Sequence, residues 1–452
     1  MLSDETLVHR LGGLVGGEHV VAGSEASRYA VDGRAPRAVA FPGSAEEVSA
    51  VMAFASAEWL KVVPRGSGTK MALGGIPARV DLVLALSRLG GIVDYEPADM
   101  TAAFRAGTRL QEAQEILGRN GQFIALDPPD ADAATIGGIL ATNSSGPRRL
   151  RYGASRDLVI ATRLVHADGK VTKAGAKVVK NVTGYDLNKL YIGSLGTLAI
   201  IVEATFRLYP VPAVEKTYLA PFASLDGLKR LVASILDSPL VPFAAELMNV
   251  EASRRVAAAA GLPWPEGSYG LALAVGSVRR EAVDAQLETV RRMSREAGGA
   301  DGHMLEGGPH DAFWRATRDF ALGDGLQAVL KASVLLTKVA EAVRVGEEVA
   351  GQHGLRLGVI SEAGSGIVRY YLTGDAASPE RFQQAVVESV SRLRAFAQEA
   401  EGNLVILKAS PEVKSRVDVW GPVGKALPLM QRSKAEFDPQ GILNPGRFVG
   451  GI

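Results

Sequence analysis

Short apolar runs alternate with helix-like segments along the first half of the chain. The strand candidates are the apolar runs at residues 34–42, 61–64, 82–86 and 102–106. Ser44 to Glu47 fits a capping box that opens an alanine-rich helix through Ala57, and Thr108 to Gln111 fits another for a helix to Gly118. The pattern therefore predicts two small α/β units, at about 30–94 and 95–212.

The pattern changes after Tyr209-Pro210-Val211-Pro212, where the two prolines predict a domain boundary. Longer strand-like and helix-like segments then take turns up to about residue 400. The strand candidates are 243–250, 269–275, 328–336, 355–360 and 366–373, and the helix candidates are 251–260, 279–297, 338–353 and 379–400. This alternation predicts an α+β, ferredoxin-like domain at 213–400, and residues 401–452 are expected to return to the first domain.

Composition narrows the chemistry that the chain can perform. The 452 residues, 47% hydrophobic and 22% charged, suit a globular protein of two or three domains. Fifty basic and 49 acidic residues argue against nucleic-acid binding. No cysteine is present, so the chain can form no disulfide and cannot hold an iron–sulfur cluster through thiolates. The six histidines show no metal-ligand spacing. The first residues show no secretory signal, so we expect a cytoplasmic protein.

Three glycine-rich segments follow apolar strands and suit close approach to an anionic ligand. They are Arg65 to Lys70, Thr135 to Gly146 and Gly193 to Ile201. Glycine lets the backbone approach a ligand, and adjacent amides and hydroxyls can donate hydrogen bonds to phosphate oxygens. The turn at Asp127-Pro128 can fix where the second segment starts. A single such segment could equally be a surface turn, but three of them predict one cofactor cradle.

Several motifs in this order resemble the FAD-linked oxidases of the vanillyl-alcohol-oxidase/PCMH type. They are Pro64-Arg65-Gly66-Ser67-Gly68, Thr135-Ile136-Gly137-Gly138, Arg151-Tyr152-Gly153, Gly184-Tyr185-Asp186-Leu187, Gly193 to Ile201 and Asn444-Pro445-Gly446-Arg447. The resemblance spans nearly the whole chain. It implies a two-subdomain PCMH-type FAD-binding domain, an α+β cap domain, and FAD bound without a Rossmann fingerprint.

The resemblance also implies the residues at the cofactor. Those expected to bind FAD are Pro64, Arg65, Gly66, Ser67, Gly68, Thr69, Lys70, Asp127, Pro128, Thr135, Ile136, Gly137, Gly138, Thr142, Asn143, Ser145, Gly146, Arg151, Gly153, Gly196, Ile200 and Asn444. Of these, Arg65 to Lys70 and the segment from Thr135 would hold the pyrophosphate. Ser67 stands where some relatives attach the flavin through histidine, and cysteine is absent, so the FAD is expected to be non-covalent.

Within this family the resemblance is closest to the FAD-binding E-type subunits of glycolate oxidase. Catalytic members of the 2-hydroxy-acid group carry a histidine-containing metal motif in the cap domain. The matching stretch runs from Glu362 to Arg369, and these two residues occupy both histidine positions, so no metal is expected. Arg318 resembles an arginine that clamps the substrate carboxylate in relatives, although a solvated helix arginine is an equally good interpretation.

The resemblance implies an FAD-dependent oxidoreductase acting on CH–OH groups of small 2-hydroxy acids such as glycolate and D-lactate. A related catalytic flavoprotein subunit and an iron–sulfur subunit are the expected partners. The iron–sulfur subunit would carry electrons toward the membrane, which this chain would reach only through its partners, at the inner face. Two alternatives stay open: a self-sufficient dehydrogenase with an unidentified base, and a structural subunit that holds FAD without catalysis.

Overall fold

The computed structural model describes residues 2–176, 185–321 and 325–452, and all elements given below belong to this part of the chain. The chain forms two compact units. The first unit contains Met1–Ser145, Gly153–Val211 and Pro422–Ile452, and the second contains Gly146–Tyr152 and Pro212–Gly421. Gly184, which opens the Gly184–Leu187 motif, lies outside the described residues.

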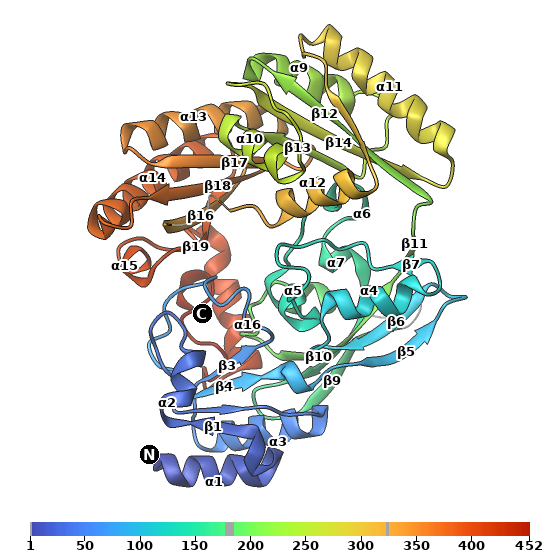
Figure 1. Ribbon diagram of the computed structural model, residues 1–452. Coiled ribbons are helices and arrows are strands. Elements are labelled where there is room, and N and C mark those ends of the chain that lie inside the picture. Colours follow the sequence, from blue (N-terminus) through green and yellow to red (C-terminus); the bar gives the residue numbers. More distant parts are fainter. Residues whose placement is uncertain (1, 177–184, 322–324) are drawn as a thin grey trace. The chain divides into compact units, whose positions relative to one another are not determined.

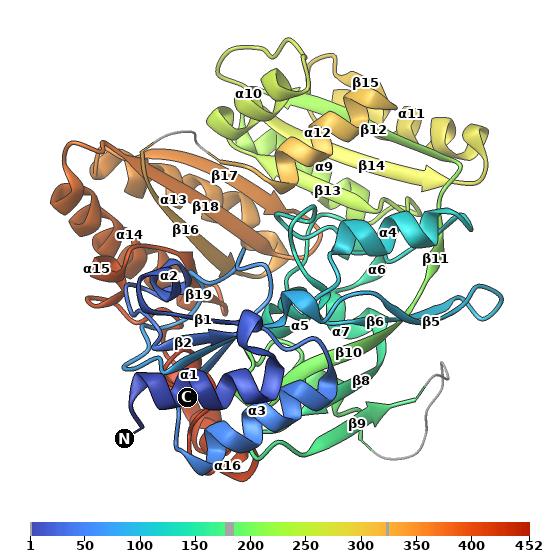
Figure 2. The same cartoon turned by 60° about the horizontal axis from the view of Figure 1, so that its bottom comes forward.

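The first sheet of the first unit is mainly parallel. Its strand order is β1 (Val20–Ala22), β2 (Ala38–Ala40), β4 (Leu82–Ala85) and β3 (Val62–Arg65). Figure 2 shows α1 (Asp4–Val15) and α3 (Ala45–Ala57) side by side, and both place buried apolar side chains in the core of this unit. The predicted cap of α3 is present, since Ser44 Oγ accepts a hydrogen bond from Glu47 N at 3.0 Å.

The second sheet of this unit is antiparallel. Its order is β5 (Ile92–Glu96), β6 (Thr101–Arg105), β10 (Ile200–Arg207), β8 (Val159–Val165) and β9 (Val171–Gly175). The predicted subdomain boundary at 94/95 is wrong, because it cuts β5, which pairs with β6. The capping box at Thr108 is also wrong: α4 (Leu110–Gly118) has no side-chain cap, and Thr108 Oγ1 instead accepts a hydrogen bond from Gly91 N at 2.9 Å.

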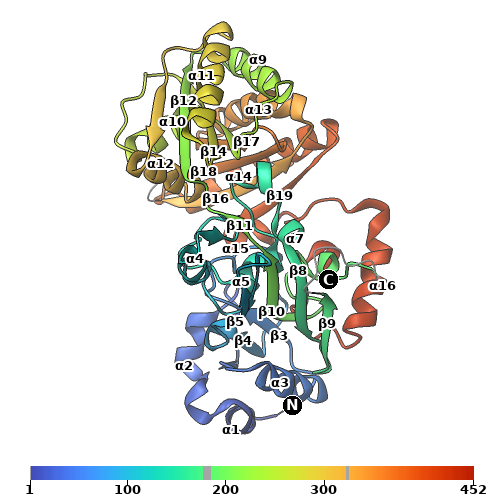
Figure 3. The same ribbon diagram turned by 90° about the vertical axis from the view of Figure 1, so that its right-hand side faces the viewer.

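The remaining elements of the first unit are short, apart from α16 (Leu427–Phe437), which is red in Figure 3. They are α2 (Gly23–Ala26), β7 (Gln122–Phe123), α5 (Ile136–Thr142), α7 (Ser155–Leu158), α8 (Asn188–Tyr191) and β11 (Tyr209–Pro210). Phe437, the last residue of α16, stacks on His166 with ring centroids 5.9 Å apart. The expected C-terminal return begins at Pro422, later than residue 401, because β19 still belongs to the second unit.

The second unit is built on one antiparallel sheet (Figure 1). Its order is β15 (His303–Glu306), β12 (Val214–Phe222), β14 (Tyr269–Ser277), β13 (Ala244–Met248), β17 (Arg356–Glu362), β18 (Ile367–Gly374), β16 (Leu326–Ser333) and β19 (Asn403–Lys408). The hydrophobic core lies between one face of the sheet and the helices α9 (Leu225–Leu236), α11 (Arg280–Glu296), α13 (Val339–Gln352) and α14 (Pro379–Glu399).

The other face of this sheet is covered only in part. Helices α10 (Val250–Ala259) and α12 (Gly308–Arg318) pack there against Met248 and Ile360. Two short helices, α6 (Arg149–Tyr152) and α15 (Pro411–Lys414), complete the unit. The structure confirms the predicted mixed α+β class. Among the described residues, no helix has the length and apolar character needed to cross a membrane.

Candidate functional site

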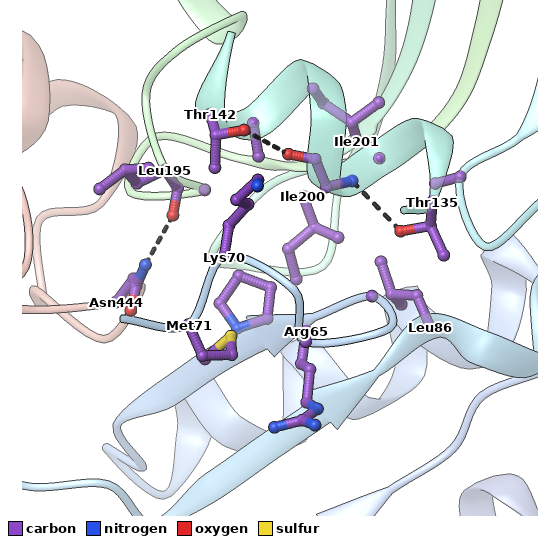
Figure 4. Close-up of a pocket in the computed structure, with 18 of the residues that line it drawn as sticks. Arg65, Lys70, Met71, Leu86, Thr135, Thr142, Leu195, Ile200, Ile201 and Asn444 are labelled. Atoms are coloured by element: carbon purple, nitrogen blue, oxygen red, sulfur yellow. Dashed lines mark hydrogen bonds between the residues drawn. The ribbon is translucent and has the colours of Figure 1, made fainter. Parts of the chain in front are cut away.

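A cavity of about 800 Å³, including its mouth, lies in the first unit where the glycine-rich segments meet. Fourteen predicted FAD-binding residues line it: Pro64, Arg65, Gly66, Ser67, Gly68, Thr69, Lys70, Thr135, Gly137, Gly138, Thr142, Gly196, Ile200 and Asn444. Figure 4 shows how the loop after β3, helix α5, the segment before β10 and the C-terminal segment converge there. Segments up to 380 residues apart in the sequence therefore form one site.

The wall also contains residues that were not predicted one by one, although Ala141, Leu195, Ala199 and Ile201 lie within the predicted glycine-rich segments. The additional lining residues are Met71, Leu73, Leu86, Ala106, Ala141, Leu195, Ala199, Ile201 and Arg447. Arg447 belongs to the Asn444-Pro445-Gly446-Arg447 motif and could have been included on that ground. The aliphatic residues outside these segments carry no local signal, because nothing in their spacing distinguishes a cofactor wall from ordinary core; they are Met71, Leu73, Leu86 and Ala106.

Eight predicted residues are not among those that line the cavity. Asp127, Pro128, Ile136, Asn143, Ser145 and Gly153 lie elsewhere in the first unit, whereas Gly146 and Arg151 belong to the second. The turn after Asp127 still touches the cradle, because Asp130 pairs with Lys70 at 2.9 Å. A direct contact of these eight residues with FAD stays a prediction.

Glycines let the cradle segments approach one another closely. A Cβ at Gly66 would lie 2.0 Å from Thr135 Oγ1, and a Cβ at Gly137 would lie 2.8 Å from that of Ala106. Gly196 has a φ of +69°, and a Cβ there would lie 2.7 Å from Cγ of Pro64. Any side chain at these positions would push the loops apart and change the shape of the cavity.

Hydroxyl groups shape the start and end of α5. Thr135 Oγ1 accepts a hydrogen bond from Gly138 N at 3.4 Å, and Thr142 Oγ1 donates one to Gly138 O at 2.8 Å (Figure 4). The Arg65 side chain points away from α5, and its guanidinium lies over the ring of Tyr29, 5.1 Å from the centroid. Burial lowers the pKa of Arg65 below its ordinary value.

The C-terminal segment fastens the cavity from the opposite side. Asn444 and Leu195 both have left-handed backbones, with φ of 46° and 54°, and Asn444 Nδ2 donates to Leu195 O at 2.6 Å. Two left-handed residues in contact indicate backbone strain held in place by the surrounding fold. The Oδ1 atom of Asn444 is buried and has no hydrogen-bond partner among the described residues.

A buried lysine connects this segment to the loop before β10. Lys434 Nζ donates to Thr197 O and Leu443 O, both at 2.8 Å, and pairs with Asp438 Oδ2 at 2.6 Å. Burial lowers the pKa of Lys434, and Asp438 opposes this effect. The lysine therefore links the C-terminal segment to a loop that lies 237 residues earlier in the sequence.

The second unit carries a row of charged side chains on the sheet face opposite its main core. Glu246 of β13 lies directly opposite Glu362 of β17 in the strand register, and Arg369 of β18 lies directly opposite Lys331 of β16. Arg369 also lies opposite Ile360, two residues from Glu362, so all four side chains share one face. We call these four residues the charged row. Burial lowers the pKa of Lys331 to about 8, and Arg369 and Arg149 act in the same direction.

Glu362 and Arg369, the two positions that the family resemblance compares with histidines, form an ion pair. Arg369 Nη2 lies 2.6 Å from Glu362 Oε1, and both side chains are largely buried. A guanidinium is not a metal ligand, and Oε1 of Glu362 is bound to that guanidinium, so this pair does not fit a metal centre. Arg318, the predicted clamp, is the last residue of α12 and pairs with Asp319 at 2.6 Å.

A second ionic cluster holds residues 146–152, which lie between α5 and α7 in the sequence but belong to the second unit. Arg148 pairs with Glu215 through both guanidinium nitrogens, at 2.8 and 2.7 Å, and His310 Nε2 lies 3.6 Å from the same carboxylate. Burial alone would raise the pKa of Glu215, but the nearby His310 ring and the two hydrogen bonds from Arg148 outweigh it and hold this pKa at about 2. The pair therefore stabilises the attachment of residues 146–152.

Comparison with known proteins gives the family. Residues 36–175 match the FAD binding domain family, and residues 211–405 and 420–448 match the C-terminal domain of FAD linked oxidases. The glycolate oxidase subunit GlcD of Bacillus subtilis is 28% identical over 91% of this chain and 89% of that protein. A D-lactate dehydrogenase of Archaeoglobus fulgidus is 30% identical over 92% of this chain and 93% of that protein. A D-2-hydroxyglutarate dehydrogenase of Xanthomonas citri is 38% identical over 44% of this chain and 42% of that protein.

Solved structures show the same fold at lower identity. A p-cresol methylhydroxylase has a TM-score of 0.76 at 17% identity and covers 98% of this chain and 96% of its own. A 4-ethylphenol oxidase from Gulosibacter chungangensis has a TM-score of 0.78 at 17% identity, with the same coverage. The predicted PCMH-type fold is thereby confirmed.

The cavity of the first unit fits the cofactor that the matched families name. Its glycine-lined loops allow close approach of a phosphorylated ligand, and the unpaired Asn444 Oδ1 offers an acceptor at its wall. The apolar side chains along its wall suit the flat ring system of the flavin. The chain belongs to the FAD-linked oxidase family and is an FAD-dependent oxidoreductase.

Proposed function

We propose that this chain oxidises the CH–OH group of small 2-hydroxy acids, as one flavoprotein subunit of a larger complex. Three relatives support the substrate class, since their names specify glycolate, D-lactate and D-2-hydroxyglutarate. The GlcD relative is named as a subunit, which supports the complex. The E-type subunit assignment stays a prediction.

The first unit would hold the cofactor. The loop from Arg65 to Lys70 and the start of α5 supply amides and hydroxyls for the pyrophosphate, while Asn444 supplies a polar contact at the opposite wall. When bound, FAD supplies the acceptor for the two electrons that leave the carbinol carbon. In this proposal the electrons pass onward to an iron–sulfur partner, since the chain has no cysteine with which to hold such a cluster itself.

The observation that carries the proposal is the charged row of the second unit. A 2-hydroxy acid needs a cation for its carboxylate and an acceptor for its hydroxyl proton. Arg369, held in place by Glu362, can supply the positive charge. Lys331 lies beside it, and burial holds its pKa at about 8, so a useful fraction is neutral and can accept a proton near neutral pH.

Lys331 also gives the self-sufficient dehydrogenase a specific base, which sequence reasoning did not identify. One preparation separates the possibilities: the purified yellow chain is mixed with glycolate or D-lactate without oxygen, and its visible spectrum is recorded. Bleaching of the flavin in the chain alone supports the self-sufficient enzyme. Bleaching only after addition of the partner subunits supports the proposed subunit.

A flavin that stays oxidised with substrate and partners would contradict the proposal and favour a structural role. The matched control is Lys331→Met, which should keep FAD but lose bleaching by substrate. In this proposal the chain works in the cytoplasm and meets the inner face of the membrane only through its partners.

A further inference from the structure

The second unit contains a cavity of about 310 Å³ on the helix-covered face of its sheet. Ala245 and Leu271 form its floor, α9 and the loop after it form one wall, and α6 forms the other. Ala245 precedes Glu246 in β13, and successive side chains of a strand point to opposite faces. Ala245 and Glu246 therefore face opposite sides of the sheet, and none of the four residues of the charged row lines this cavity.

The walls of this cavity are aliphatic. Val232, Ile235 and Leu236 come from α9, and Leu240 and Val241 come from the following loop. Leu236 and Val241 are 44% and 52% exposed, although both are large hydrophobic side chains. Exposed aliphatic side chains around an apolar cavity indicate a surface that a ligand covers.

One charged group lines the cavity among the described residues: Arg151 of α6. Its Nη1 lies 3.3 Å from Gly276 O, and its guanidinium lies 5.6 Å from the centroid of the Tyr152 ring. Neither contact neutralises the charge, and no carboxylate of the described chain pairs with it. An aliphatic cavity with a guanidinium at its edge suits a ligand with an apolar tail and an anionic head.

The volume sets the size of this ligand. A volume of about 310 Å³ lies at the small end of the range for pockets that take small organic ligands, so a short-chain or medium-chain molecule is favoured over a larger one. Octanoate is a molecule of this class. We propose that this cavity binds an aliphatic monocarboxylate of medium chain length, with the carboxylate at Arg151 and the tail between α9 and the sheet.

Isothermal titration of the FAD-loaded chain with octanoate tests the proposal. We expect a Kd below about 1 mM, because small ligands in well-formed pockets reach this range. Hexanoate should bind more weakly, by about three- to fourfold for each methylene removed. Arg151→Gln should weaken octanoate binding about tenfold, whereas Arg279→Gln, an exposed arginine outside the cavity, should leave it unchanged.

Two further measurements separate the head from the tail. 1-Octanol should bind the wild-type protein and Arg151→Gln equally, since it offers no charge to the guanidinium. Val232→Trp should fill the cavity and abolish binding of both ligands; if this variant does not fold, the chain-length series and Arg151→Gln decide alone. Absence of octanoate binding, equal affinity for hexanoate and octanoate, or unchanged affinity in Arg151→Gln would overturn the proposal.

Discussion

Lys434 joins the C-terminal segment to the loop before β10, and both of these parts of the chain line the FAD cavity. Its ammonium group meets two backbone carbonyls and the carboxylate of Asp438, which is fully buried. Replacing it with methionine keeps the length of the side chain but removes the charge and all three contacts. Asp438 then keeps only the backbone donors of Ile442 and Leu443, at 3.0 and 2.8 Å.

The expected cost follows from the burial of the pair. Removing one partner of a buried ion pair costs about 3–5 kcal/mol, because the other charge stays buried without compensation. Since Asp438 retains two backbone hydrogen bonds, we expect Lys434→Met to lose about 3 kcal/mol of unfolding free energy. Thr197 lies in the segment that lines the cavity, so FAD should also dissociate at least about tenfold faster, which corresponds to about 1.4 kcal/mol.

Guanidinium denaturation and flavin fluorescence measure the two effects. Lys425→Met is the matched control, because Lys425 is exposed and precedes the same helix. The double variant with Asp438→Asn should cost at least about 1 kcal/mol less than the sum of the two single variants, because the two groups interact directly. A loss below about 1 kcal/mol in Lys434→Met, or strict additivity in the double variant, would refute this reasoning.

Three further predictions follow from the same geometry. Gly196→Ala should weaken FAD binding at least about tenfold, because the new Cβ would meet the Pro64 ring in a left-handed backbone; Gly121→Ala, with a φ of +63° and open space, controls for the backbone alone. Glu215, whose pKa is lowered from 4.5 to about 2, should contribute about 3 kcal/mol of stability above pH 4.5, lost as pH falls toward 2. Denaturation at pH 3 and 6 should therefore show a smaller difference in Glu215→Gln than in wild type. If Lys331 is the base, substrate should reduce the flavin faster as pH rises through about 8, and Lys331→Met should lack this rise; a rate that falls through pH 8 would argue instead for a carboxylate-binding ammonium.

Local patterns in the sequence were sufficient to predict many of the helices and strands. The helix expected at 279–297 is α11 (Arg280–Glu296), and the strand expected at 269–275 is β14 (Tyr269–Ser277). These segments are predictable because periodicity and turn residues act within a few positions of the chain. The glycine-rich segments were recognisable for the same reason, since small residues that permit close approach recur at short spacing.

Which side chains contact one another could not be predicted, because this depends on strand register and on contacts between segments far apart in the sequence. Lys331 and Arg369 share a face only because β16 pairs with β18 in a single register, and a shift of one residue would turn one of them toward the core. Arg151 was expected at the FAD because of its motif, yet it belongs to the second unit, whereas the cradle lies in the first. The Lys434 contact with Thr197 spans 237 positions. The sequence by itself determined which segments form the cradle, and the tertiary structure decided which charges face one another, because that depends on contacts between distant parts of the chain.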